Sequence, residues 1–145
     1  MERQMLLENL RIGSTQMQKT IVTESMLAKQ VGSGDLDVLA TPVVLNMMEQ
    51  LASHMILADL NSQDFTSVGT SVKIRHLAPT PLGVEVKIKA TVIGIDRKKI
   101  VFRMEVTDPK ETIADGVHER MLVNRKEFIA KADQKLPNNS DSSND

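Results

Sequence analysis

The sequence of 145 residues contains no cysteine, no tryptophan and no tyrosine, and its only aromatic residues are three phenylalanines. The absence of cysteine excludes a disulfide framework, a thiol nucleophile and a cysteine-ligated metal site. With so few aromatic side chains the chain has little to stack on bases, and its formal net charge of -1 does not attract a polyanion. Nucleic-acid binding is therefore not expected.

Long hydrophobic runs are also missing. No stretch approaches the length of about 20 consecutive apolar residues that a membrane-spanning helix needs. The N-terminal stretch MERQMLLENLRIGS has scattered charges and lacks the apolar core of a secretory signal, so we expect a soluble, cytoplasmic protein. The length suits one domain, expected over residues 1–132. The polar segment DQKLPNNSDSSND, residues 133–145, is expected to be disordered.

Residues 41–60, TPVVLNMMEQLASHMILADL, carry the strongest helix signal. Thr41 is predicted to be the N-cap and Pro42 the first helical residue, positions that these residue types favour. The segment NSQD, residues 61–64, ends the helix. Apolar residues recur at helical spacing, which predicts a largely buried helix. They are Val44, Met48, Leu51, Met55 and Ala58.

Alternating apolar and polar residues after this helix predict a sheet. Four such segments follow one another, with a turn at residues 96–99 between the second and the third. One long helix followed by antiparallel strands indicates an α+β architecture, in which a curled antiparallel sheet wraps the helix. The strands are expected over residues 68–76, 84–92, 100–106 and 111–124, a further strand over residues 20–28, and short helices over residues 1–12 and 126–131.

His76 is an ionisable residue on the apolar face of a predicted strand, which it shares with Val68, Val72 and Ile74. The strand ends directly after it, because two prolines follow and cannot continue the ladder. One interpretation is a hydrogen-bonded histidine in the core or at its rim. The other is a general base, or a polar contact for a reacting carbonyl group.

Glu49 lies on the predicted helix among the apolar residues Leu45, Ala52 and Ile56. A carboxylate on an apolar flank loses hydration and needs a partner. Such a setting can produce a base or a nucleophile. The alternative is that Glu49 reaches solvent through a gap or pairs with a lysine.

Thr41 precedes Glu49 by eight residues, which puts both on roughly the same side of the helix. At about 1.5 Å per residue their Cα atoms lie about 12 Å apart, so the two side chains cannot bond directly. A substrate, His76 or a second subunit would have to lie between them. Besides capping the helix, the Thr41 hydroxyl could contact a substrate at the positive helix end, where free N–H groups stabilise a developing oxyanion.

His118 and Arg120 share a face of the last predicted strand with the small residues Ala114 and Gly116. Small residues there permit close packing or a close-lying ligand, and Arg120 could pair across strands or hold an anionic group. His54 is expected at the surface. The three histidines lack metal-ligand spacing such as HExxH, and no GxGxxG, Walker or GxSxG motif occurs, so no metal or cofactor is expected.

Three segments together resemble a known family: GSGDLDVLATPVVLNMMEQ at residues 32–50, VGTSVKIRHLAPTPLG at residues 68–83 and DGVHER at residues 115–120. In this order and spacing they are similar to the fluoroacetyl-CoA thioesterase-like family of hot-dog-fold proteins, over about residues 10–128. The resemblance implies a hot-dog fold, in which an antiparallel sheet wraps one long helix. It also implies a homodimer with sites at the subunit interface.

The resemblance assigns roles to single residues as well. It implies that Thr41, Glu49 and His76 match the family's catalytic threonine, glutamate and histidine. Gly69 and Arg120 match positions that line the family's substrate site. The implied activity is hydrolysis of an acyl-CoA thioester to a free acid and coenzyme A, with no cofactor.

One departure from the family concerns the loop DLDVLA, residues 35–40. Fluoroacetate-specific members carry aromatic residues near this loop, and here it has none, so a general acyl-CoA is the expected substrate. The alternative function is a non-hydrolytic acyl-CoA-binding or regulatory protein of the same fold. A hot-dog hydratase is not expected, because its Asp/His dyad motif is missing.

Overall fold

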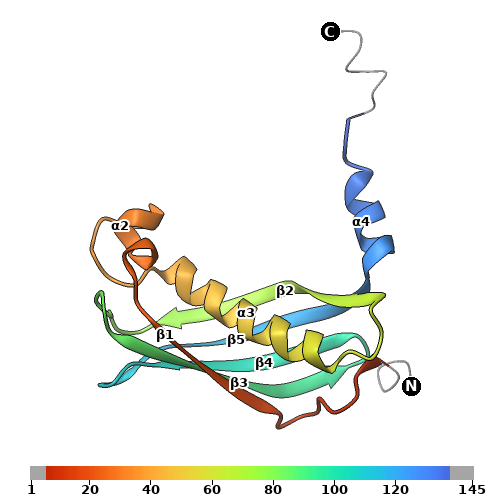
Figure 1. Cartoon of the computed structure of the whole chain (residues 1–145), viewed down its shortest axis with the longest axis horizontal. Coiled ribbons are helices and arrows are strands. Elements are labelled where there is room, and N and C mark those ends of the chain that lie inside the picture. The colour runs from red at the N-terminus through yellow and green to blue at the C-terminus, as the bar shows by residue number, and fades with distance from the viewer. Residues whose placement is uncertain (1–5, 138–145) are drawn as a thin grey trace, which may run out of the picture.

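A five-stranded antiparallel sheet and one long helix across its inner face make up most of the protein (Figure 1). The computed structural model describes residues 6–137, and the strands follow the order β1-β3-β4-β5-β2. The predicted α+β architecture is therefore confirmed. In chain order the elements are β1 (Thr15–Ile21), η1 (Glu24–Met26), α2 (Ala28–Val31), α3 (Thr41–Asp59), β2 (Phe65–His76), β3 (Glu85–Asp96), β4 (Lys99–Thr107), β5 (Thr112–Asn124) and α4 (Arg125–Asp133).

The long helix α3 begins at Thr41, one residue earlier than predicted. Ala40 is the N-cap, with an extended backbone (φ -76°, ψ 141°), so the predicted capping role of Thr41 is wrong. Pro42 follows within the first turn, where its missing N–H costs no hydrogen bond. Because Thr41 is not the cap, its hydroxyl is available for another partner. The helix buries Val44, Met47, Met48, Leu51, Ala52, Met55 and Ile56.

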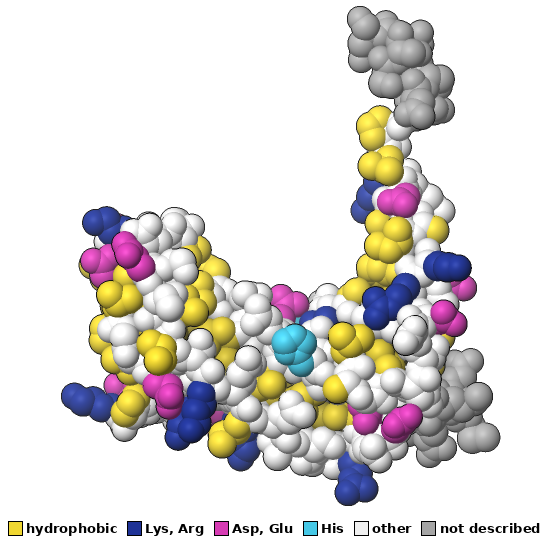
Figure 2. Space-filling model, in the orientation of Figure 1, with side chains coloured by type: hydrophobic (Ala, Val, Ile, Leu, Met, Phe, Trp, Pro, Cys, Tyr) yellow, Lys and Arg dark blue, Asp and Glu magenta, His cyan; other side chains and the backbone are white. Residues whose placement is uncertain are grey.

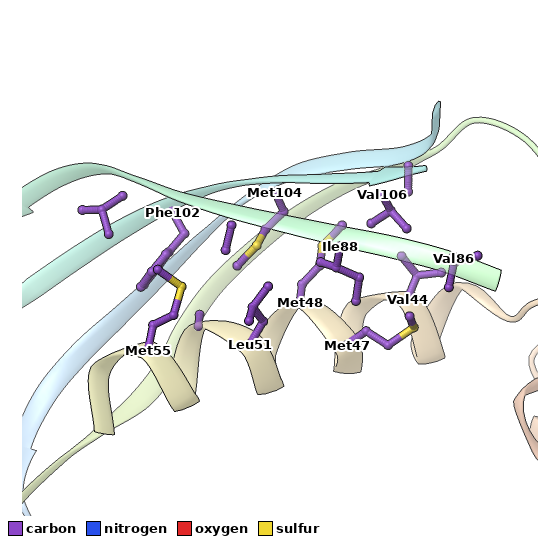
Figure 3. Packing of buried hydrophobic residues seen from close by; sticks show 14 of the residues in the cluster. Val44, Met47, Met48, Leu51, Met55, Val86, Ile88, Phe102, Met104 and Val106 are labelled. Atoms are coloured by element: carbon purple, nitrogen blue, oxygen red, sulfur yellow. The ribbon is translucent and has the colours of Figure 1, made fainter. Parts of the chain in front are cut away.

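The core lies between α3 and the central strands β3 and β4 (Figure 3). Both strands alternate as predicted, because their polar residues face solvent while their apolar residues point toward the helix. Phe102 is fully buried and Met104 lies above Met48 (Figure 3). The apolar contributions of the two strands are Val86, Ile88, Ala90, Val92, Ile100, Phe102, Met104 and Val106.

A β-bulge in β2 changes which residues face the helix. Its register against β5 shifts between Gly69 and Ser71, so Thr70 has no opposite residue. Before the bulge, Ser67 and Gly69 face inward. The prediction of strict alternation from Val68 to His76 is therefore wrong, because the extra residue at the bulge reverses which side chains point toward the helix.

The segment before α3 differs most from the sequence prediction. The first strand is β1 rather than residues 20–28, and those residues continue into η1. The strand β1, with the sequence TQMQKTI, is almost wholly exposed. Its apolar residues Met17 and Ile21 are exposed as well, so it buries no apolar face that alternation could reveal. A short helix was predicted over residues 1–12. Leu7 instead forms an isolated β-bridge to Leu60, and no helix covers residues 7–12. Residues 1–5 lie outside the described range.

The C-terminal helix α4 was predicted over residues 126–131 and is confirmed. Asn124 caps it, because its side-chain carbonyl accepts the backbone N–H of Glu127 at 3.0 Å. Figure 1 shows α4 projecting away from the sheet, and Figure 2 shows hydrophobic side chains at the surface along this projection. Phe128 and Ile129 of α4 are exposed. The predicted polar tail begins at its last residue, and residues 138–145 lie outside the described range.

Among the described residues, no helix has both the length and the apolar composition needed to cross a membrane.

Gly116 allows β5 to lie close to β2. A Cβ there would collide with the backbone carbonyl of Lys73. We expect Gly116→Ala to lower the free energy of unfolding by about 1–3 kcal/mol, the usual cost of overpacking. Gly94→Ala is the matched control, because its Cβ would make ordinary contacts of 3.6 Å with Val101. Denaturant unfolding measures both variants, and equal stability would contradict the packing role of Gly116.

Candidate active site

Thr41 and His76 form a hydrogen-bonded pair at the head of α3. The Thr41 hydroxyl lies 2.7 Å from His76 Nδ1. Thr41 is the first residue of α3 and His76 is the last residue of β2. The chain before α3 is held beside the end of β2, because the Leu39 N–H donates to the Thr80 carbonyl at 2.8 Å. Two residues that are 35 positions apart are thereby brought into contact.

The surroundings of His76 favour its neutral form. Burial lowers the pKa of the imidazole below its usual value of 6.5. Its Nε2 atom is buried and has no hydrogen-bond partner among the described residues. A neutral imidazole with a free nitrogen can accept a proton from a neighbouring hydroxyl or from water.

A cavity of about 320 Å³ opens beside this pair. Thr41 and His76 supply polar groups to its wall, and most of the other lining residues are apolar. That combination of apolar surface with a few polar groups is typical of small-molecule sites. The apolar lining residues are Ala28, Val38, Leu39, Ala40, Leu77, Ala78 and Pro79.

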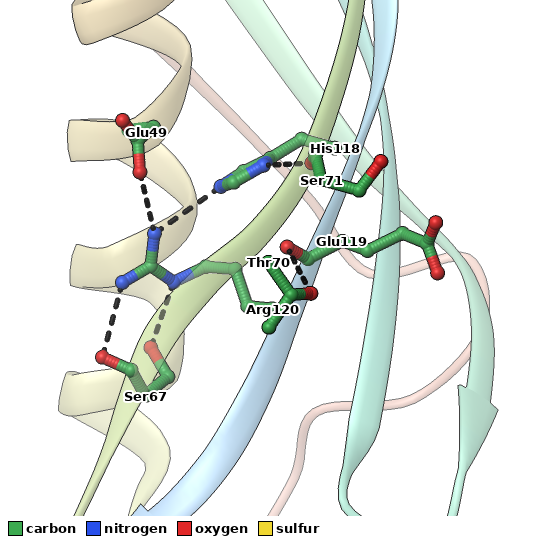
Figure 4. A network of polar contacts seen from close by, with 7 residues as sticks. All are labelled: Glu49, Ser67, Thr70, Ser71, His118, Glu119 and Arg120. Carbon is green, nitrogen blue, oxygen red and sulfur yellow. Dashed lines mark hydrogen bonds and ion pairs between the residues drawn. The ribbon is translucent and has the colours of Figure 1, made fainter.

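A second polar group, which we call the Glu49 cluster, consists of Glu49, Ser67, His118 and Arg120 (Figure 4). Arg120 Nη1 lies 3.5 Å from Glu49 Oε2. The same guanidinium donates from Nε to Ser67 Oγ at 2.8 Å and from Nη2 to the Ser67 carbonyl at 3.1 Å. Glu49 is therefore paired, with an arginine rather than the lysine that was considered.

Burial differs sharply within this cluster. The side chain of Arg120 is 7% exposed, whereas that of Glu49 is 39% exposed and open to a ligand. Burial lowers the pKa of Arg120, and the Glu49 carboxylate raises it again in part. The Arg120 guanidinium makes four polar contacts inside the protein, two with Ser67 and one each with Glu49 and His118. It therefore holds Glu49 in place.

His118 is completely buried and links β2 to Arg120. Its Nδ1 atom lies 2.9 Å from the Ser71 carbonyl, and its Nε2 atom lies 3.2 Å from Arg120 Nη1. Burial is the main cause that lowers its pKa below 6.5. Sequence reasoning did not select His118 as a site residue, although it shares a strand face with Arg120.

Gly69 lies opposite Arg120 in the β2–β5 register, at a position where a side chain has no room. A Cβ at this position would collide with the Glu49 carboxylate. It would also lie 3.3 Å from His118 Cε1 and 3.4 Å from Arg120 Nη1. The absence of a side chain therefore makes room for the Glu49 cluster.

The structure brings Thr41 to His76 and Glu49 to Arg120, but it keeps these two groups apart. Among residues 6–137, no hydrogen bond or ion pair joins one group to the other. His54 is exposed on α3, as expected. Within the same residues, no cluster of three or more His, Asp or Glu side chains is arranged to hold a metal ion.

The half-buried His76 and the buried His118 predict a pH dependence of stability. Because the pKa values of His76 and His118 lie below 6.5, the unfolded chain binds more protons between those values and 6.5. The free energy of unfolding therefore decreases as pH falls through this window. His76→Gln and His118→Gln should each make the decrease shallower in denaturant unfolding, and exposed His54→Gln should not. Parallel curves for all variants would contradict this assignment.

Comparison with known proteins supports the predicted fold. A fluoroacetyl-CoA thioesterase from Streptantibioticus cattleyicolor is 29% identical over 101 residues, which make up 70% of this chain and 72% of that protein. A solved fluoroacetyl-CoA thioesterase superposes with a TM-score of 0.83 at 24% identity, covering 90% of this chain and 100% of that chain. A hot-dog-like protein from Thermanaerovibrio acidaminovorans gives 0.82 at 25% identity, covering 95% and 99%. The predicted hot-dog fold is therefore confirmed.

The match to a protein family covers most of this chain. The family described as fluoroacetyl-CoA-specific thioesterase matches residues 22–126. This range contains the Thr41–His76 pair and the whole Glu49 cluster. The chain belongs to the fluoroacetyl-CoA-specific thioesterase family.

Proposed function

We propose that this protein is an acyl-CoA thioesterase, which hydrolyses a thioester to a free acid and coenzyme A. The observation that carries the proposal is the Thr41–His76 hydrogen bond beside an apolar cavity at the head of α3. Family membership supports the reaction class. A solved variant of a relative was crystallised with fluoroacetate and CoA, which supports the same ligand class.

The thioester carbonyl is proposed to lie at the N-terminus of α3. The partial positive charge of this helix end and the Thr41 hydroxyl stabilise the oxyanion that forms when the carbonyl carbon is attacked. His76, which is neutral, orients water or accepts its proton. Collapse of the tetrahedral intermediate then breaks the carbon–sulfur bond, and the leaving thiolate takes up the proton that the attacking water has given to the base.

Glu49 is proposed either to attack the carbonyl carbon, which displaces the thiolate and forms an anhydride that water then hydrolyses, or to activate water as a general base. Both roles need a carboxylate that is held in place and still accessible. Arg120 holds Glu49 on one side, and the exposed part of the Glu49 side chain remains free for the substrate. Gly69 completes the substrate-binding surface because it leaves this space open.

The separation between the two groups favours a site that a second copy completes. Eight helical residues put Thr41 and Glu49 about 12 Å apart within one chain. In the described sheet, β2 is an edge strand, and such an edge can pair with another chain. We therefore propose a homodimer formed along β2, with the active site at the subunit interface and the acyl-CoA lying across the gap.

The substrate is proposed to be a general acyl-CoA rather than fluoroacetyl-CoA. The loop before Thr41 contains no aromatic residue, and its Leu36 is 67% exposed. The loop itself contributes the aliphatic Val38 and Leu39 to the cavity wall. An aliphatic wall accommodates an apolar acyl group without selecting for fluorine.

Release of coenzyme A from a panel of short, long and aryl acyl-CoAs tests the proposal. A thiol-reactive dye detects the product, and the cysteine-free protein contributes no signal. We expect one acyl class to be hydrolysed, and Glu49→Gln and His76→Gln each to lower kcat by about 100-fold or more. Saturable binding of acyl-CoA without hydrolysis would instead identify a non-hydrolytic acyl-CoA-binding protein.

Gly69→Ala should separate activity from stability. The added methyl displaces the end of the Glu49 side chain, which can rotate away at little cost in folding. We expect kcat to fall by about 10- to 100-fold, because small displacements of a reacting group have large effects. The melting temperature should change little. Gly94→Ala, on β3, serves as the control and should retain full activity.

A further inference from the structure

We propose that His118 is a positioning residue: as its neutral Nδ1–H tautomer, it accepts a hydrogen bond from Arg120 and so directs that guanidinium toward Glu49. This inference rests on the proposed role of Glu49 in thioester hydrolysis. It assigns a function to a buried histidine that does not itself reach the substrate cavity beside Thr41. The argument depends on the hydrogen-bonding capacity of the groups in Figure 4.

The tautomer of His118 follows from its two partners. The Ser71 carbonyl can only accept a hydrogen bond, so the Nδ1 atom that lies 2.9 Å away carries the proton. The Arg120 guanidinium can only donate, so the Nε2 atom that lies 3.2 Å away presents its lone pair. Only the neutral Nδ1–H form of the ring satisfies both contacts.

The orientation of Arg120 depends on this lone pair. Ser67 accepts two hydrogen bonds, from Nε and from Nη2, which hold one edge of the guanidinium. Nη1 points to the other side, where His118 accepts at 3.2 Å and Glu49 lies at 3.5 Å. Nη1 is the nitrogen of Arg120 that faces the Glu49 carboxylate. Because its contact with His118 is shorter than its contact with Glu49, His118 restrains the position of Nη1 more closely.

The environment of His118 keeps the ring in this form. Val72 on β2 and Phe102 on β4 lie opposite it in the sheet, and neither carries a charge. Burial has the largest effect on the pKa of His118 and lowers it. Of the charged groups that act on the ring, Arg120 also lowers this pKa, whereas Glu49 and Glu119 raise it. Protonation would turn Nε2 into a donor facing another donor, and the contact with Arg120 would be lost.

The bulge in β2 provides the acceptor that fixes the ring. Thr70 has no opposite residue on β5, and its hydroxyl donates to the Glu119 carbonyl at 3.1 Å. Immediately after the bulge, the Ser71 carbonyl receives the imidazole N–H. The same irregularity turns Gly69 inward, where a side chain would collide with Glu49. One feature of β2 therefore serves both the ring and the carboxylate.

Two amide variants test the proposal. In His118→Asn the amide nitrogen can replace Nδ1–H toward Ser71 but no acceptor reaches Arg120, whereas in His118→Gln the amide oxygen can replace Nε2. We expect kcat to fall about tenfold or more in His118→Asn with KM changed by less than about threefold, and to be largely retained in His118→Gln. Equal losses in both variants, at matched melting temperatures, would overturn the proposal.

A spectroscopic measurement does not depend on turnover. Long-range ¹⁵N–¹H spectra of the wild-type protein near neutral pH should show His118 protonated at Nδ1 and unprotonated at Nε2. Slow exchange of the Arg120 Nη1 protons, which face His118, should persist in His118→Gln and be lost in His118→Asn. An Nε2–H tautomer, or unchanged Arg120 exchange in His118→Asn, would overturn the inference. Absent hydrolysis alongside the expected spectra would instead count only against the proposed function.

Discussion

Arg120 carries a positive charge to a position where only 6% of the residue is exposed, and a charge so placed must be compensated. Ser67, His118 and Glu49 supply that compensation from two strands and a helix. These contacts account for several features that would otherwise be unrelated. They include a glycine opposite the arginine, a bulge in the edge strand and a glutamate on an otherwise apolar helix flank.

The rigidity of α3 then determines how the proposed site is divided. A helix holds Thr41 and Glu49 at a constant separation, so each must find its own partner on the sheet. Thr41 meets His76 at the end of β2. Glu49 meets Arg120 of β5, which lies opposite Gly69 near the middle of β2. The thioester group is small compared with this gap, which is why the proposed mechanism includes a second copy of the chain. In that proposed arrangement the cavity beside Thr41 would hold the acyl group.

Much of the fold could be predicted because its signals are local. The apolar spacing on α3 and the alternation on β3 and β4 report directly which face is buried. Errors arose where a local rule competes with tertiary contacts. The capping preference of threonine was outweighed because the chain before α3 is held against Thr80, which makes Ala40 the cap. The edge strand β1 was missed because an edge with exposed faces needs no apolar pattern.

The sequence by itself determined the architecture and the family, and it singled out Thr41, Glu49 and His76 as the proposed catalytic residues, because residue types, periodicity and motif order are present in the chain. Only the tertiary structure decided how these residues are grouped. It paired Thr41 with His76, placed Arg120 against Glu49 and revealed that His118 is hydrogen-bonded to Arg120. The physical reason is that a hydrogen bond depends on a few tenths of an ångström between residues far apart in sequence, and a single bulged residue changes which of them face one another.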